Sequence, residues 1–263
     1  MPNDSLTQSL FKAAKQGDTA ELERLIQRGN LEGFYSYALT YAVANDHLDC
    51  VKMLAAQCLP LTLYQSGLVP ALQSNHSECA HYLLSLFTQP FDCEDALEAA
   101  ATHDNVEMVK KLLVFCDPNA EKSAERSCKP GSLALVKAVA NGHTEIFELL
   151  WPHFDPQDFQ GLALYMAAKH NRVAFFERLL PMSDPGANQG AALRIALERG
   201  HLHLAELLYP YTDLQKAIQY VKDCRPEWYE EFAERLFFLE ARVQKNMLNA
   251  HIVAPPASAG RKM

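Results

Sequence analysis

Ten histidines and seven cysteines are the residues of this chain whose types could bind a metal or carry out nucleophilic catalysis. Imidazole nitrogens and thiolates are common zinc ligands, and a histidine can activate a cysteine nucleophile. The segment His201-Leu202-His203 places two imidazoles two residues apart, but no cysteine or carboxylate spacing near it completes a zinc site. The chain also lacks the motifs C-x-x-C, H-E-x-x-H and G-x-S-x-G and a glycine-rich phosphate loop. The sequence therefore predicts no catalytic residue, no metal and no cofactor.

Four of the histidines owe their spacing to an internal repeat. They are His47, His76, His143 and His201, and each directly follows a small or polar residue that we call an anchor. A leucine stands seven residues before and eight residues after every anchor, and an alanine stands four residues before it. The seven anchors, at intervals of 29, 29, 29, 38, 29 and 29 residues, are Gly17, Asp46, Asn75, Asp104, Gly142, Asn171 and Gly200. A fixed period of this length predicts stacked repeats, so these histidines are one position repeated along a stack and do not converge on one site.

One unit, residues 37–59, shows what each repeat is expected to build. Leu39, Ala42 and Val43 have the spacing of one face of a short helix, and apolar residues between 50 and 55 give a second helix the same pattern. The anchor between the two helices is always Gly, Asn or Asp, the residues that most readily adopt a positive φ. Helices of about eight residues are marginal alone in water, so each unit must pack against its neighbours.

This unit resembles an ankyrin repeat, whose first helix reads roughly T-P-L-H-x-A-A and whose turn reads G-H. The pairs Gly142-His143, Gly200-His201 and Asp46-His47 fall on that turn, and residues 133–151 are the nearest copy. The resemblance covers roughly residues 6–213 and implies a structural role for the turn histidine. It predicts an all-α, ankyrin-like solenoid of about seven helix–turn–helix repeats.

Two features depart from that family pattern. No unit keeps the T-P start, and the period is 29 residues where the family has 33. We expect the missing residues to come from the connection after the second helix, which leaves shortened hairpins. The predicted domains are a repeat array over 1–213 with an insertion near 116–131, C-terminal capping helices over 214–249, and a disordered tail over 250–263.

Composition restricts the partners and the compartment. The net charge is 24 − 32 = −8, whereas binding to nucleic acid or to an anionic membrane favours a basic surface. Neither is therefore an expected partner. No signal peptide and no apolar run long enough for a transmembrane helix are evident. We expect a cytoplasmic monomer.

The cysteines fit the same compartment. Cys50 and Cys79 share a repeat position that other units fill with larger apolar residues, so both are expected to be small buried hydrophobes. The chain has seven cysteines, an odd number, and no pair of them has the spacing of zinc ligands. This cysteine usage is typical of a reducing cytosol.

These observations favour a noncatalytic scaffold that binds a protein partner on the concave face made by the first helices. Residues one and two positions before each anchor vary while the core positions are fixed, and Tyr35 and Tyr64 share a register. Aromatic residues contribute strongly to binding hot spots, although these rings could instead pack under the shortened hairpins. The candidate partner-binding residues are Tyr35, Tyr37, Tyr41, Tyr64, Gln73, His103, Asn141, Lys169, His170 and Arg199.

Two other hypotheses stay open. The resemblance extends to ankyrin-type effectors of intracellular bacteria, so the chain could act as an effector or adaptor in the cytosol of a host cell, with the repeats selecting the target. The third hypothesis is an enzyme with a site in the groove, formed by a close cysteine–histidine or carboxylate pair, because such partners need not be adjacent in sequence.

Overall fold

The computed structural model of this protein describes residues 3–29, 31–115, 132–153 and 161–253. The chain divides into two compact units, residues 1–155 and 156–263. Every regular element within the described ranges is helical, and none of them is a strand. The predicted all-α class is therefore confirmed. The predicted insertion at 116–131 lies outside the described residues.

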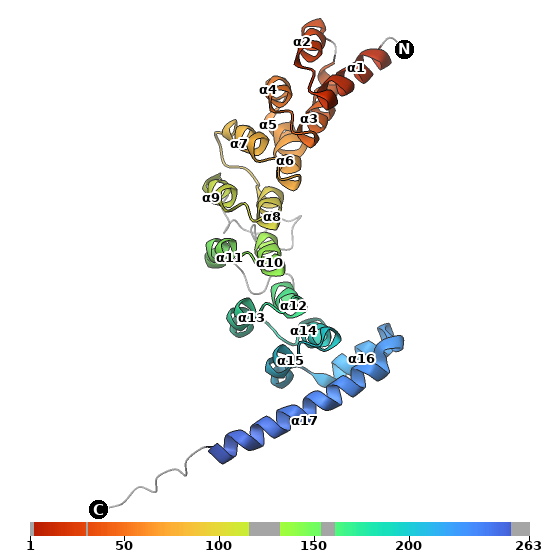
Figure 1. Ribbon diagram of the computed structural model, residues 1–263, viewed down its shortest axis with the longest axis vertical. Coiled ribbons are helices and arrows are strands. Elements are labelled where there is room, and N and C mark those ends of the chain that lie inside the picture. Colours follow the sequence, from red (N-terminus) through yellow and green to blue (C-terminus); the bar gives the residue numbers. More distant parts are fainter. Residues whose placement is uncertain (1–2, 30, 116–131, 154–160, 254–263) are drawn as a thin grey trace, which may run out of the picture. The chain divides into compact units, whose positions relative to one another are not determined.

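The described part of the first unit is a stack of helix pairs. In Figure 1 the first helices of the pairs form one layer and the second helices form another. The pairs are α1 (Asn3–Gln16) with α2 (Thr19–Arg28), α3 (Tyr35–Ala44) with α4 (Leu48–Ala55), a composite helix with α7 (Ser77–Ser85), α8 (Glu94–Thr102) with α9 (Val106–Phe115), and α10 (Ser132–Asn141) with α11 (Thr144–Leu150). The composite helix joins α5 (Pro60–Leu63), a π turn η2 (Tyr64–Leu68) and α6 (Val69–Gln73). Consecutive first helices pack together, as do most consecutive second helices, and α7 approaches α9 through His81 and Glu107 at 3.5 Å.

The repeated leucines and alanine form the core of the helix pairs in both units. All twenty-one of these residues are at most 3% exposed. The position that holds Cys50 and Cys79 is also buried, as are its apolar counterparts Met108, Ile146, Phe175 and Leu204. Burying a leucine side chain contributes about 1.5 to 3 kcal/mol, so the shared stripe between neighbouring pairs supplies the stability that one short helix lacks.

Each anchor has the positive φ that its residue type predicts. Values range from 53° at Asn171 to 88° at Gly142. At each of the seven turns the backbone N–H after the anchor donates to the carbonyl of the alanine four residues before it, as in His47 N–H to Ala42 O at 3.0 Å. This left-handed turn satisfies a carbonyl that the end of the helix would otherwise leave unpaired.

The turn histidines link each repeat to the one before it. The His47 ring donates to the carbonyl oxygen of Lys15 at 3.1 Å, and the His76 ring donates to that of Val43 at 2.7 Å. His143 and His201 make the corresponding bonds to Thr102 and Lys169, both at 3.3 Å. Each ring thus satisfies a carbonyl at the C-terminal end of the preceding first helix. The structural role expected for these histidines is confirmed.

The third repeat carries the longest first helix of the inner repeats, and proline shapes it. Pro60 begins the helix, where its missing N–H is harmless. Pro70 lies inside the helix and cannot donate to Ser66 O, and the Thr40 hydroxyl of α3, which lies 3.1 Å from that carbonyl and 3.2 Å from Ser36 O of its own helix, shares its proton between the two. The wide η2 turn precedes Pro70. A tertiary hydrogen bond therefore replaces the helical bond that Pro70 removes.

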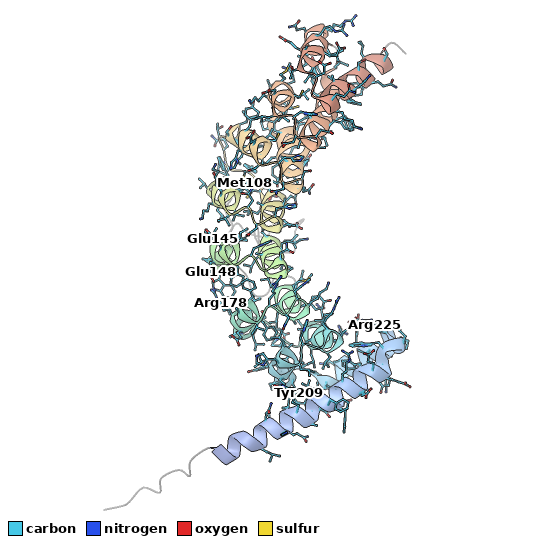
Figure 2. All side chains as sticks on the ribbon, viewed as in Figure 1. Met108, Glu145, Glu148, Arg178, Tyr209 and Arg225 are labelled. Carbon is cyan, nitrogen blue, oxygen red and sulfur yellow. The ribbon has the colours of Figure 1, made fainter. Side chains whose placement is uncertain are left out.

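The second unit continues the helix pairs and ends in longer helices. Its elements are α12 (Leu162–Lys169) with α13 (Val173–Leu179), α14 (Ala187–Arg199) with α15 (Leu202–Leu208), then α16 (Leu214–Cys224) and α17 (Tyr229–Val253). Helix α17 contacts α14, α15 and α16 and buries Phe232, Leu236 and Leu239 against them. Arg225, labelled in Figure 2, forms an ion pair with Glu198 of α14 at 3.0 Å. The first four residues of the predicted tail, 250–253, extend α17, and the rest of the tail lies outside the described residues.

Short 3-10 turns occupy the connections after the second helices, where the sequence predicted shortened hairpins. The described ones are η1 (Glu32–Phe34), η3 (Trp151–His153), η5 (Leu180–Met182) and η6 (Tyr209–Tyr211). The last three contain a proline at their second residue, which fixes the backbone soon after the second helix ends. The expected loss of residues after the second helix is therefore met by compact turns.

Candidate functional site

Two aromatic clusters lie on the first unit, and the candidate tyrosines belong to them or to the core beside them. The first cluster surrounds Phe11 of α1. Phe34, Tyr37 and Tyr41 place their ring centroids 6.3, 6.2 and 5.4 Å from that of Phe11. Tyr37 is 62% exposed and Tyr41 is 43% exposed. We call these four residues the Phe11 cluster.

Tyr35 is not part of that surface, which corrects the expectation that it contacts a partner. Its side chain is only 5% exposed at the start of α3, directly after the η1 turn. Burial, and then the nearby carboxylate of Glu32, raise the pKa of the Tyr35 hydroxyl. Packing beneath a shortened connection, the alternative that the sequence left open, is therefore the arrangement found for Tyr35.

The second cluster lines a cavity of about 470 Å³ between the start of the composite helix and the connection from α7 to α8. Phe91 is its centre, with ring centroids 5.3 Å from Tyr64 and 4.5 Å from Phe87. The Tyr64 hydroxyl accepts a hydrogen bond from Ala96 N–H, in the first turn of α8, at 3.3 Å. This contact fixes one wall of the cavity. We call the cavity lined by Tyr64, Phe87 and Phe91 the aromatic groove.

A second hollow continues from the aromatic groove along the first-helix layer. It has a volume of about 350 Å³ and is lined by side chains of α6 and α8, including the candidates Gln73 and His103. Asp95 lines both hollows, so they meet at this carboxylate. His103 donates from its ring to the Gln73 carbonyl oxygen at 2.9 Å, which holds the two helices together there. We call this hollow the helix-face pocket.

Acidic side chains predominate in the sequence around these two hollows. Residues 53–109 contain seven aspartates and glutamates and no lysine or arginine. The lysines on the following helices pair with carboxylates: Lys110 with Glu145 at 2.7 Å, Lys111 with Glu107 at 2.7 Å, and Lys137 with Glu98, which lines the helix-face pocket, at 3.1 Å. Glu145 is labelled on α11 in Figure 2. Within the described residues no salt bridge reaches Asp95, which is exposed.

The other candidate residues lie at the ends of first helices. Asn141, at the end of α10, is exposed and donates from its amide to Thr102 O at 3.0 Å. Lys169, His170 and Arg199 lie in the second unit, where partial burial and then the neighbouring cations Lys169, Arg172 and Arg199 lower the pKa of His170. Lys169 and Arg199 thus place two cations beside His170. Seven of the ten candidates lie in the first unit and these three lie in the second.

Cys50 and Cys79 have the properties of core residues, whereas Cys58 is half-buried and Cys224 is exposed. Burial raises the pKa of the Cys50, Cys58 and Cys79 thiols, and for Cys79 burial together with the Asp46 carboxylate raises it to about 12. A thiol with so high a pKa is a poor nucleophile. Cys93 is disulfide-bonded, and its partner lies outside the described residues. That bond is not what cysteine usage predicted for a reducing compartment, and the compartment stays a prediction.

Two further features bear on the classes of function. Across the described ranges no group of three or more His, Cys, Asp or Glu side chains could hold a metal ion. No helix in those ranges is both long enough and apolar enough to cross a membrane.

Phe11, Phe91 and Asp95 were missed at the level of sequence. A signal for the groove was nevertheless present, because the absence of basic residues over 53–109 can be read from the chain itself. The position of Phe91 in a connection gave no periodic pattern from which to place it.

Comparison with known proteins supports the interpretation of the repeat. Residues 97–191 match the family model for ankyrin repeats in three copies. No curated protein matches the chain. Ankyrin repeats generally mediate contacts between proteins.

Proposed function

We propose that this chain, an ankyrin-repeat protein, is a noncatalytic scaffold that binds a protein partner on the layer formed by its first helices. The observation that carries the proposal is the Phe11 cluster, which leaves Tyr37 mostly and Tyr41 partly exposed on helix α3. Aromatic side chains can bury a large area on binding while losing little conformational entropy. The cluster is held on two packed helices, so little ordering is required of this side of the interface.

Rigid turns support this role. The histidine bonds between repeats fix the ends of neighbouring first helices, where the variable polar side chains lie. A surface that changes from repeat to repeat on a constant core can be matched to one partner. The high pKa of the Cys79 thiol supports the noncatalytic part of the proposal, because it keeps that thiol protonated near neutral pH. None of the described residues favours delivery into a host cell over a cytoplasmic role in the producing cell, and we therefore propose the simpler scaffold.

The test is affinity capture from the native cell with three forms of the full chain. The Tyr37→Ala/Tyr41→Ala double variant removes the exposed rings and is expected to fold, because both side chains are well exposed. Tyr211→Ala is the matched control, since Tyr211 is 60% exposed and lies in the second unit. A protein recovered by the wild type and the control, with a loss of about tenfold or more in the double variant, would support the proposal. Equal recovery by all three forms would remove it.

A further inference from the structure

The aromatic groove has the form of a docking site for an apolar side chain. Its lining includes Leu61, Leu63, Tyr64, Phe87 and Phe91, and its volume of about 470 Å³ is open to solvent along a rim that holds Leu61. Leu61 is 67% exposed and Leu86, also at the groove, is 40% exposed. Contiguous exposed apolar surface of this kind is uncommon unless something covers it. Covering these side chains on binding would remove apolar surface from water, which favours association.

The charge beside the groove selects what kind of chain would cover it. Asp95 stands where the groove meets the helix-face pocket, and Glu98 lies one helical turn further along the pocket. Lys137 of α10 pairs with Glu98 at 3.1 Å, whereas no salt bridge among the described residues reaches Asp95. A ligand that crosses from the groove into the pocket therefore passes one carboxylate, Asp95, that no cation of the described residues pairs with.

We propose that the aromatic groove and the helix-face pocket together bind a short peptide segment of the partner, with one large apolar side chain in the groove and a lysine or arginine over Asp95. This rests on the proposed scaffold function and adds the chemistry of the segment that is bound. The apolar side chain supplies buried area, and the basic side chain supplies the charge that Asp95 lacks. An acidic segment would be repelled at the same place. The segment is extended across two adjoining hollows, which a single side chain does not fill.

A displayed library of random eight-residue peptides, selected on the purified full chain, tests the motif directly. The expected result is enrichment of peptides that carry Leu, Ile, Met or Phe within one to three residues of Lys or Arg. Selected peptides are then synthesised with a fluorescent label, and their affinity is measured by fluorescence polarisation. A matched peptide with glutamate in place of its basic residue is expected to bind about tenfold or more weakly.

Variants of the chain assign the binding to the groove. Leu61→Glu and Asp95→Lys change exposed side chains, and each is expected to lower the affinity for the selected peptide about tenfold or more. Leu59→Glu is the control for Leu61→Glu, because Leu59 is 75% exposed and does not line the groove. Glu78→Lys, at an exposed carboxylate of α7, is the control for Asp95→Lys. Both controls should bind like the wild type.

The outcomes separate this inference from the proposed function. If the selection yields no apolar–basic motif, or if Leu61→Glu and Asp95→Lys bind the peptide as the wild type does, the peptide site is wrong even when partner capture depends on the Phe11 cluster. If the motif and both variant effects appear while capture is indifferent to Tyr37 and Tyr41, the peptide site stands and the assignment to the Phe11 cluster fails. A small apolar compound that binds while no peptide does would also overturn the inference.

Discussion

The second and third repeats share one pattern but present different surfaces. Both have a tyrosine eleven residues before the anchor, Tyr35 in one and Tyr64 in the other. Tyr35 is buried at the start of α3, whereas Tyr64 is half-buried and forms a wall of the aromatic groove. The third repeat starts its first helix earlier, at Pro60, and widens it into a π turn at the tyrosine. Equal register therefore does not produce equal exposure, because the length and shape of the first helix decide what covers the ring.

Replacing Tyr35 and Tyr64 separately should give the largest difference in stability between the second and third repeats. Tyr35→Ala removes a buried ring and is expected to lower the free energy of unfolding by about 3 to 5 kcal/mol. Tyr64→Ala removes a half-buried ring and its hydrogen bond to Ala96 N–H, at a cost of about 1 to 2 kcal/mol. Urea unfolding monitored by circular dichroism measures both values. A larger loss for Tyr64→Ala than for Tyr35→Ala would break the comparison.

Exchanging the small residues eight positions before the anchors should show how closely the two first helices are packed. The third repeat has Gly67 where the second has Ala38. A methyl group at Gly67 would lie 3.2 Å from both terminal methyls of Leu83 and 3.3 Å from Leu39. Gly67→Ala is therefore expected to destabilise by about 1 to 3 kcal/mol through overpacking. Ala38→Gly should cost about 1 kcal/mol or more, because it loses helix propensity and a buried methyl.

Thermal unfolding of both exchange variants checks this expectation. If Gly67→Ala proves as stable as the wild type or more stable, the space around Gly67 is larger than the contacts indicate. The first helix of the third repeat is then packed no more closely at this position than that of the second repeat.

The hydrogen bond from the Thr40 hydroxyl to Ser66 O, which links the second and third repeats, can be isolated with a double-mutant cycle. Thr40→Val removes the donor to Ser66 O and should cost about 1 kcal/mol in the wild type. In a Pro70→Ala background the new backbone N–H can satisfy Ser66 O, so the same Thr40→Val change should cost less. Chemical unfolding of the four forms gives the coupling. Equal costs in both backgrounds would show that Pro70 is not the reason for this contact.

The smallest expected difference between the two repeats is the effect of their cysteines on the free energy of unfolding, and it appears only at high pH. The Cys79 thiol donates to the Asp46 carboxylate at 3.3 Å, and its pKa is raised to about 12 from an ordinary value near 9.0. A pKa raised by folding gives stability that is complete below the unfolded pKa and is lost as the pH rises towards the folded one. The wild type should therefore lose stability above about pH 9, and Cys79→Ala should reduce that loss.

Cys50→Ala is the matched control for this measurement. Burial also raises the pKa of Cys50, but Asp49 and Asp18 act on it only through their charge. Unfolding free energies between pH 8 and 10.5 should change less with pH for Cys79→Ala than for Cys50→Ala. The reverse order would show that the carboxylate of Asp46 does not distinguish the two thiols.

The repeat, its turns and its core could be predicted because each depends on local chemistry. Gly142 and Asp46 differ in every respect except their tolerance of a positive φ, and the turn requires only that tolerance. The leucines and the alanine recur because every pair of helices packs against the next in the same way. Small residues at the position of Gly67 recur as well, as Ser9, Ala38, Gly67, Ala96, Ala134, Ala163 and Ala192, and indicate the close approach of the first helices.

The candidate surface was harder to predict for a physical reason. Exposure of an aromatic ring depends on what lies above it, and a connection without periodicity gives no register for its residues. Phe91 comes from such a connection, and Phe11 meets Tyr37 and Tyr41 only because α1 packs on α3. The expected contacts at Tyr37 and Tyr41 remain a proposal, whereas burial excluded Tyr35.

By itself the sequence determined that this protein is a stack of helix pairs with left-handed turns, because these features follow from residue type and spacing within one repeat. The hydrogen bonds from the turn histidines to the preceding repeat came from the structure. Only the tertiary structure decided which tyrosine is buried and where a groove opens. It also showed that Asp95 stands between two hollows without a cation beside it among the described residues. The reason is that a repeat fixes contacts that are the same in every unit, while a binding surface arises where one unit differs from its neighbours.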